Sequence, residues 1–152
     1  MKSLVFGVSL AIALASQAEV VVKNGDRIGF LGDSITANGN RPAGYVNMVM
    51  KGLELAGVKA EKVAAGVSGN KSNDMLARVE KDVLSRKVQW MTLSCGVNDV
   101  WHGARGVELE PYKANIGAIL DKCAAAGVKV VVLTATMIRE DASNRENTKL
   151  AG

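Results

Sequence analysis

Three short segments of the chain each combine a glycine with polar side chains that could do chemistry. They are Gly32-Asp33-Ser34, Gly66-Val67-Ser68-Gly69-Asn70 and Gly96-Val97-Asn98-Asp99. A serine on a tight turn is exposed and held in place, as a nucleophile must be. Acyl transfer also needs donors where an oxyanion forms, and the backbone N–H groups of Ser34 and Gly69 and the side-chain amide of Asn98 would supply them. The residue types therefore favour a serine ester hydrolase, provided that the fold brings the segments together.

Each segment taken alone also has an ordinary structural explanation. Gly-Asp-Ser is a common turn, and Gly-Val-Asn-Asp is typical of a helix cap. The functional interpretation is favoured because the three segments follow successive apolar runs that have the length of β-strands. These runs, with a fourth further along the chain, are residues 27–31, 61–65, 89–95 and 128–134.

Between the strand-like runs, apolar residues recur at the spacing of α-helices. The helical patterns span residues 45–53, 72–83 and 111–126. Ser72 and Asn73 are suited to cap the second helix, and Gly127 to end the third. Strands separated by one helix each run parallel, with right-handed crossovers. The sequence therefore predicts an α/β fold, a doubly wound parallel sheet in a three-layer sandwich.

In such a sheet, function lies at the carboxyl ends of the strands. If the strands, numbered along the chain, have the order 2-1-3-4, the topological switch point lies beside Ser34 and Asn98. The unbroken valines of residues 128–134 predict that this strand is buried on both faces. After Thr136 the sequence indicates a loop and a helix start at Ser143.

The three segments resemble the blocks of the SGNH (GDSL-type) hydrolases. Gly32-Asp33-Ser34 is similar to the first block, Val67-Ser68-Gly69 to the second and Gly96-Val97-Asn98-Asp99 to the third. The resemblance implies a flavodoxin-like sheet, Ser34 as nucleophile, and Gly69 and Asn98 completing the oxyanion hole. Family members hydrolyse acetylated carbohydrates, lipids, thioesters and small acyl esters. The Gly-x-Ser-x-Gly elbow of the other large esterase fold is absent from the sequence.

The chain departs from this family in one block. The family's Asp-x-x-His near the C-terminus has no counterpart after Thr134. We therefore expect residues 19–152 to form an SGNH domain that lacks its last strand and helix, and this chain to be an inactive or impaired fragment. The same Asp-x-x-His pattern occurs earlier in the chain, at Asp99-Val100-Trp101-His102, and includes the only histidine of the sequence. His102 as general base is the weaker hypothesis, because Asp99 belongs to the third block, where a structural role is usual.

Composition excludes several other classes of function. The net charge of +4 is spread without a Lys/Arg run, and aromatic residues make up 4%, so nucleic-acid binding is not expected. No Cys/His cluster has the spacing of metal ligands, and neither Gly-x-Gly-x-x-Gly nor a P-loop is present, so no metal or cofactor is expected. Cys95 ends a strand and Cys123 lies on a helix, too far apart for a disulfide, which predicts two buried free thiols.

The first 18 residues have the layout of a secretory signal peptide. Lys2 precedes an uncharged apolar run at residues 4–15, and Ser16-Gln17-Ala18 offers small residues for cleavage. The run is too short to span a bilayer, although an N-terminal anchor is the alternative. We therefore expect a secreted or periplasmic protein without stable membrane insertion after cleavage.

The sequence indicates the class of substrate only weakly. Trp101, His102 and Arg105 would form a polar and aromatic wall beside the nucleophile, which suits a sugar ring. This favours deacetylation of carbohydrate esters. The alternatives are a lipase, lysophospholipase or thioesterase of the same family, or a non-catalytic module that binds its ligand without turnover.

Overall fold

The computed structural model describes residues 20–136 and 145–150. Within them, four strands form one sheet in the order β2-β1-β3-β4, and every neighbouring pair is parallel. The strands are β1 (Arg27–Gly32), β2 (Glu61–Gly66), β3 (Trp90–Ser94) and β4 (Lys129–Leu133). The predicted fold class is confirmed, and the strand order is the one for which the topological switch point lies beside Ser34 and Asn98.

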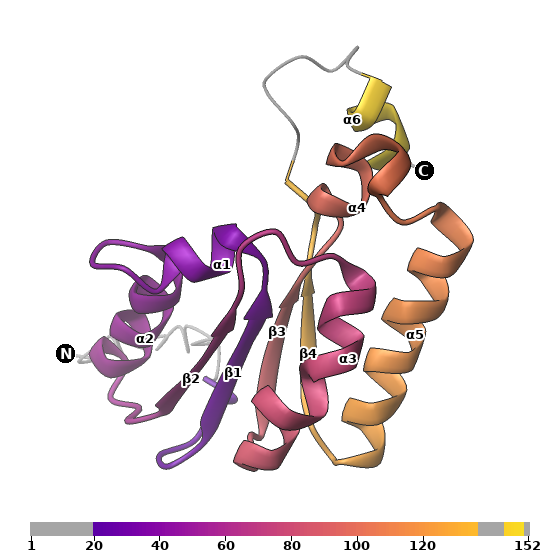
Figure 1. Cartoon of the computed structure of the whole chain (residues 1–152). Helices are drawn as coiled ribbons and strands as arrows, with labels where there is room; N and C mark the ends of the chain where they lie inside the picture. The colour runs from indigo at the N-terminus through magenta and orange to yellow at the C-terminus, as the bar shows by residue number, and fades with distance from the viewer. Residues whose placement is uncertain (1–19, 137–144, 151–152) are drawn as a thin grey trace, which may run out of the picture.

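Helices connect the strands and cover both faces of the sheet (Figure 1). The long helices lie close to the predicted ranges: α2 (Tyr45–Leu55), α3 (Ser72–Asp82) and α5 (Leu109–Ala125). The short elements are α1 (Ser34–Gly39), η1 (Leu84–Arg86), α4 (Val97–Trp101), η2 (Gly103–Arg105) and α6 (Arg145–Leu150). The sequence indicated turns, not helices, at α1 and α4. A helix of little more than one turn is too short to produce a recognisable apolar period.

The hydrophobic core consists of two clusters, one on each face of the sheet. On one face, Met91 and Leu93 of β3 pack with Val79 of α3 and Ile119 of α5. On the other face, Ile28 and Phe30 of β1 pack against Val46 of α2. The apolar faces of the helices therefore cover the central strands β1 and β3 on both sides of the sheet.

The fourth strand differs from the prediction. Residues 128–134 were expected to be buried on both faces, but Val131 is 48% exposed and Val132 is 56% exposed. Among the described residues, β4 pairs only with β3 and forms one edge of the sheet. Burial of a strand depends on its neighbours as much as on its own apolar side chains, and this information is absent from the local sequence.

Two expectations fall on residues that the structure does not describe. The signal peptide at residues 1–18 and the helix start at Ser143 lie outside the described ranges. In the part of the chain that is described, no helix has both the length and the apolar character needed to cross a membrane.

Candidate active site

The carboxyl ends of three strands lie level with one another. Gly32 at the end of β1 is in register with Gly66 of β2 and with Ser94 of β3. The three segments that follow these strands therefore emerge at one edge of the sheet, where α1 and α4 lie (Figure 1).

The first segment places Ser34 at the start of a short helix. Asp33 is the N-cap of α1, and its Oδ1 accepts a hydrogen bond of 2.8 Å from the backbone N–H of Ile35. A Cβ added at Gly66 would collide with the backbone of Ala37, so α1 can lie over the end of β2 only because that residue is a glycine. Ser34 itself is partly exposed, as a nucleophile that meets substrate must be.

The second segment holds Gly69 in a left-handed conformation. Its φ is +79°, and a Cβ added there would meet nothing within 4 Å. The glycine is therefore favoured by the backbone conformation and not by lack of space. Val67 anchors the segment, because its N–H donates to the carbonyl of Gly32 at 3.0 Å.

The third segment joins the other two through one side chain. The Nδ2 of Asn98 donates to the carbonyl of Asn70 at 3.0 Å and lies 3.4 Å from the Oδ2 of Asp33. Asn70 follows Gly69, and Asp33 precedes Ser34. The contact to Asp33 is long for a hydrogen bond, so the second N–H of the amide is only weakly engaged and is available to a bound oxyanion.

Asp33 lies in an unusual electrostatic position for a carboxyl. It is 1% exposed, and this burial raises its pKa, with the nearby charge of Asp99 acting in the same direction. The hydrogen bond from the N–H of Ile35 favours the ionised form and opposes these effects on the pKa. The residue is therefore a buried acceptor next to the proposed nucleophile.

The structure gives Asp99 a structural role. Its carboxylate is 3% exposed and accepts hydrogen bonds from the backbone N–H of Ser72 at 3.0 Å and from its hydroxyl at 2.6 Å. Asn115 of α5 donates to the same hydroxyl at 3.0 Å. Ser72 was predicted to cap α3, but it is the first helical residue, with Lys71 at the N-cap position. Asp99 reaches the start of α3 from the separate helix α4, which local sequence cannot reveal.

The residues of the predicted substrate wall lie on α4 and η2. Trp101 is 53% exposed, His102 is half-buried at the end of α4, and Arg105 is exposed. The Nζ of Lys71 donates to the carbonyl of Arg105 at 3.0 Å and ties this wall to the segment after β2.

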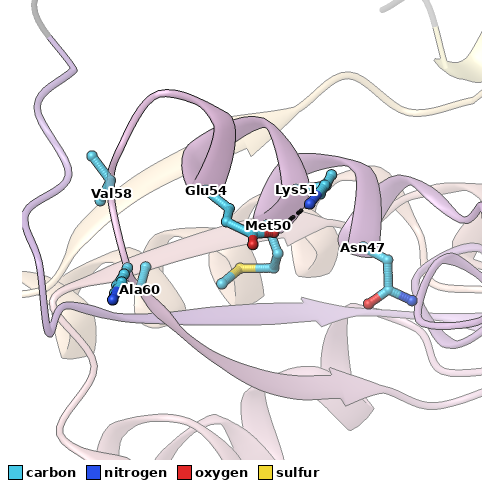
Figure 2. Close-up of a pocket in the computed structure, with 7 residues that line it drawn as sticks. Asn47, Met50, Lys51, Glu54, Val58 and Ala60 are labelled. Carbon is cyan, nitrogen blue, oxygen red and sulfur yellow. Dashed lines mark hydrogen bonds and ion pairs between the residues drawn. The ribbon is translucent and has the colours of Figure 1, made fainter.

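Two of the surface hollows that the described residues form differ in their relation to the strand ends. One, of about 450 Å³, is lined by α2 and residues 58–60, which lead into the amino end of β2 (Figure 2). It lies away from Ser34, and its rim carries the Lys51–Glu54 ion pair at 2.7 Å. The other, of about 390 Å³, lies among α4, the start of α5 and α6, beside Gly96 and Asp99. The second hollow therefore lies at the carboxyl edge of the sheet, where the three segments emerge.

The two cysteines are as the sequence predicts. Cys95 and Cys123 are both unpaired and buried, which confirms the two free thiols. Burial raises the pKa of both thiols, and for Cys95 the charge of Asp99 adds to this increase in pKa. Within residues 20–136 and 145–150, no group of three His, Cys, Asp or Glu residues is placed to hold a metal ion.

The sheet order and the three segments at its carboxyl edge define a class of α/β ester hydrolases. A model of the GDSL-like lipase/acylhydrolase family matches residues 30–151, and the chain belongs to this family. The family resemblance inferred from the three blocks is thus confirmed.

The relatives and solved structures that the chain resembles include acetylxylan esterases. The chain is 31% identical over 121 residues to an acetylxylan esterase of Geobacillus stearothermophilus, with 65% of this chain and 54% of that protein aligned. The crystal structure of the acetyl xylan esterase AlAXEase matches with a TM-score of 0.76 and 32% identity, covering 82% of this chain and 67% of that one. Axe2 of Geobacillus stearothermophilus shares the fold, with a TM-score of 0.73 at 22% identity over 85% of this chain and 68% of Axe2. The chain spans about half the length of the curated relative.

Sequence reasoning missed the residues that support the site. Neither Arg78, which binds the ends of two strands, nor the bond from Asn98 to Asn70 was expected. Arg78 lies on a helix whose charged residues look like an ordinary solvated face. No local signal distinguishes it, because its partners belong to other elements.

Proposed function

We propose that this protein is a serine ester hydrolase that removes acetyl groups from carbohydrate esters. The proposal extends to this chain the activity named for its relatives, the acetylxylan esterases. The observation that carries it is the amide of Asn98, which contacts Asn70 at 3.0 Å and Asp33 at 3.4 Å. Asp33 is the chain neighbour of Ser34 and Asn70 is that of Gly69, so the amide of Asn98 links all three segments of the proposed site.

In the proposed reaction, the Oγ of Ser34 attacks the carbonyl carbon of the ester and gives its proton to solvent water. The oxyanion that forms accepts hydrogen bonds from the backbone N–H groups of Ser34 and Gly69 and from the Nδ2 of Asn98. The C–O bond to the sugar then breaks, the sugar oxygen takes up a proton, and an acetyl-serine is left. Water hydrolyses this acyl-enzyme, releases acetate and restores Ser34. One such donor accounts for about 10²–10³ in rate.

The third block, Gly96-Val97-Asn98-Asp99, does not provide an acid that could orient a general base. The carboxylate of Asp99 is bound to Ser72 and is not available to orient His102. We therefore expect His102→Gln to leave hydrolysis within about 3-fold of wild type. A base contributes about 10²–10⁴ to the rate, so we propose that this chain alone turns over natural esters slowly.

The test uses a substrate whose leaving group needs no proton. p-Nitrophenyl acetate releases a stable phenolate, so its departure needs no general acid, and the proton of Ser34 passes to solvent. We expect Ser34→Ala to reduce the rate to that of buffer. Ser68→Ala is the matched control, because Ser68 is an exposed serine in the neighbouring segment and we expect no change. Equal rates for wild type and Ser34→Ala would overturn the proposal.

The substrate class is tested separately from the chemistry. A series of p-nitrophenyl esters from acetyl to octanoyl, with acetylated xylo-oligosaccharides beside it, separates a carbohydrate deacetylase from a lipase or thioesterase. We expect the rate to fall as the acyl chain lengthens. A rise with chain length would favour the lipase alternative, and saturable binding without hydrolysis would favour a ligand-binding module.

We also propose that the protein is exported. The support is the charged start, the apolar run and the small residues at 16–18. Expression of the full chain in a bacterium with a secretory pathway should give a mature protein that begins at Glu19. Mass spectrometry of the exported fraction measures this, and a protein that retains Met1 would contradict it.

A further inference from the structure

We infer that Arg78 of α3 is a positioning residue that holds the segment carrying Gly69 against the segment carrying Ser34. The inference rests on the proposed function in one respect, since it concerns the same site. Its structural part, the coupling between the segments, can be measured without any hydrolysis.

The guanidinium of Arg78 binds three elements at once. Its Nη2 donates to the carbonyl of Gly32 at 2.9 Å, and its Nη1 donates to the carbonyl of Ala65 at 2.9 Å. Its Nε donates to the Oδ1 of Asn70 at 2.6 Å. One side chain therefore joins the last residue of β1, the end of β2 and the segment that follows β2.

The surroundings of Arg78 make these bonds strong. Its side chain is only 15% exposed, and the Oδ2 of Asp82, one turn along α3, lies 3.1 Å from Nη1 and balances the charge. Charge-assisted hydrogen bonds of this kind are about twice as strong as neutral ones. A lysine has a single point of charge and cannot reproduce the planar set of donors.

The same contacts lead to each part of the proposed oxyanion hole. Gly32, whose carbonyl accepts from Arg78, immediately precedes Asp33 and Ser34, and it also accepts the N–H of Val67 at 3.0 Å. Asn70 follows Gly69; its side chain is held by Arg78, and its carbonyl accepts from Asn98 at 3.0 Å. Loss of the guanidinium would remove none of the proposed oxyanion donors. It would instead free the segment after β2, which carries the N–H of Gly69 and the Asn70 carbonyl that holds the amide of Asn98.

Arg27 provides a matched control at the other end of the same two strands. Its Nε pairs with Glu61 at 2.8 Å, and its Nη1 donates to the carbonyl of Arg86 at 3.1 Å. Arg27→Lys and Arg78→Lys thus make the same chemical change at the amino and carboxyl edges of the β1–β2 pair. A general effect on the sheet would appear in both variants.

The first measurement is NMR, which does not depend on turnover. In Arg78→Lys we expect faster hydrogen exchange of the Val67 amide and shifted side-chain amide signals for Asn98. We expect Arg27→Lys to leave both as in wild type. Asn70→Ala, which removes only the acceptor of Nε, should move the same signals and serves if Arg78→Lys does not fold.

The second measurement is Ser34-dependent hydrolysis of p-nitrophenyl acetate. We expect Arg78→Lys to lower kcat by about 10- to 100-fold with KM little changed, because a small misplacement of catalytic groups has this size of effect. Arg27→Lys should retain wild-type kcat.

The outcomes separate the two proposals. Unchanged Val67 exchange and Asn98 signals in Arg78→Lys, or equal changes in Arg27→Lys, would overturn the positioning role. If the NMR signals respond as expected but wild type and Ser34→Ala hydrolyse equally, the positioning role stands and the proposed function fails.

Discussion

At the scale of single residues, the proposed oxyanion hole is built from groups that meet only through the fold. The amide of Asn98 contacts Asn70 and Asp33, which precede it by 28 and 65 residues. Gly69 contributes a left-handed backbone conformation, and Asp33 contributes a buried carboxyl that lies 3.4 Å from the amide of Asn98. Each residue therefore makes a different and separately testable physical contribution.

The left-handed conformation of Gly69 predicts an order among its variants. An alanine in this conformation is strained by about 1–2 kcal/mol, whereas asparagine adopts it more readily. We expect Gly69→Ala to lower Ser34-dependent hydrolysis of p-nitrophenyl acetate by about 10-fold, which corresponds to ~1.4 kcal/mol. Gly69→Asn should retain more of the activity. Equal losses in the two variants would show that the backbone conformation is not what matters.

The raised pKa of Asp33 predicts a pH dependence of stability. The folded state keeps this proton to a higher pH than the unfolded chain, whose ordinary pKa is about 4. The residue's contribution to stability is therefore full below that pH and is lost as pH rises through the folded pKa.

Urea unfolding of wild type and Asp33→Asn from pH 4 to pH 8 measures this. The free energy of unfolding of wild type minus that of the variant should fall as pH rises and then become constant. A difference that grows with pH would contradict the direction of the pKa shift.

At the scale of elements, the site depends on how α3 and α4 are joined. The carboxylate of Asp99 on α4 accepts from the first residue of α3, Ser72, and Asn115 of α5 donates to the same serine. This buried network holds the start of α3 against α4, the short helix that carries Asn98. Arg78 lies about two turns further along α3, so the hydrogen bonds at the start of this helix also help to fix the position of Arg78.

The buried hydroxyl of Ser72 predicts a loss of stability on truncation. Ser72→Ala removes the hydroxyl that donates to Asp99 and accepts from Asn115, so Asp99 keeps only the backbone N–H of residue 72 and the amide of Asn115 loses its acceptor, which should lower the free energy of unfolding by about 1–3 kcal/mol. Ser85→Ala is the control, since the hydroxyl of Ser85 is bonded to the carbonyl of Lys81 at an exposed site. We expect that variant to stay within about 0.5 kcal/mol of wild type in urea unfolding. Similar losses for both would contradict the buried network.

At the scale of the whole molecule, two helical layers enclose the central strands and bury both thiols. Cys95 is 6% exposed and Cys123 is 0% exposed, and burial raises the pKa of each. Because thiolate is the reactive form, both a closed core and a raised pKa oppose modification.

The two thiols therefore report on opening of the whole core. We expect the folded protein to react negligibly with a thiol-specific disulfide reagent at pH 8, and both thiols to react at once in denaturant. Absorbance of the released chromophore measures the number of thiols. Rapid reaction of either cysteine without denaturant would mean that its part of the core opens locally.

The chain's local patterns were sufficient for the four strands, the three long helices and the three segments at the strand ends, but not for the short helices α1 and α4. Apolar periodicity and glycine stops depend on neighbouring residues, so the positions of the long helices and strands could be predicted from them. The parallel direction followed from the alternation of strand and helix. The family membership followed from short blocks such as Gly32-Asp33-Ser34, which are also local.

Other features depended on contacts between distant parts of the chain. The exposure of Val131 and Val132 depends on which strands lie beside β4. The bonds from Asp99 to Ser72 and from Arg78 to Gly32 depend on how loops and helices meet. Hydrogen bonds and burial are properties of pairs of groups in space, and the three-dimensional packing alone decides which pairs form.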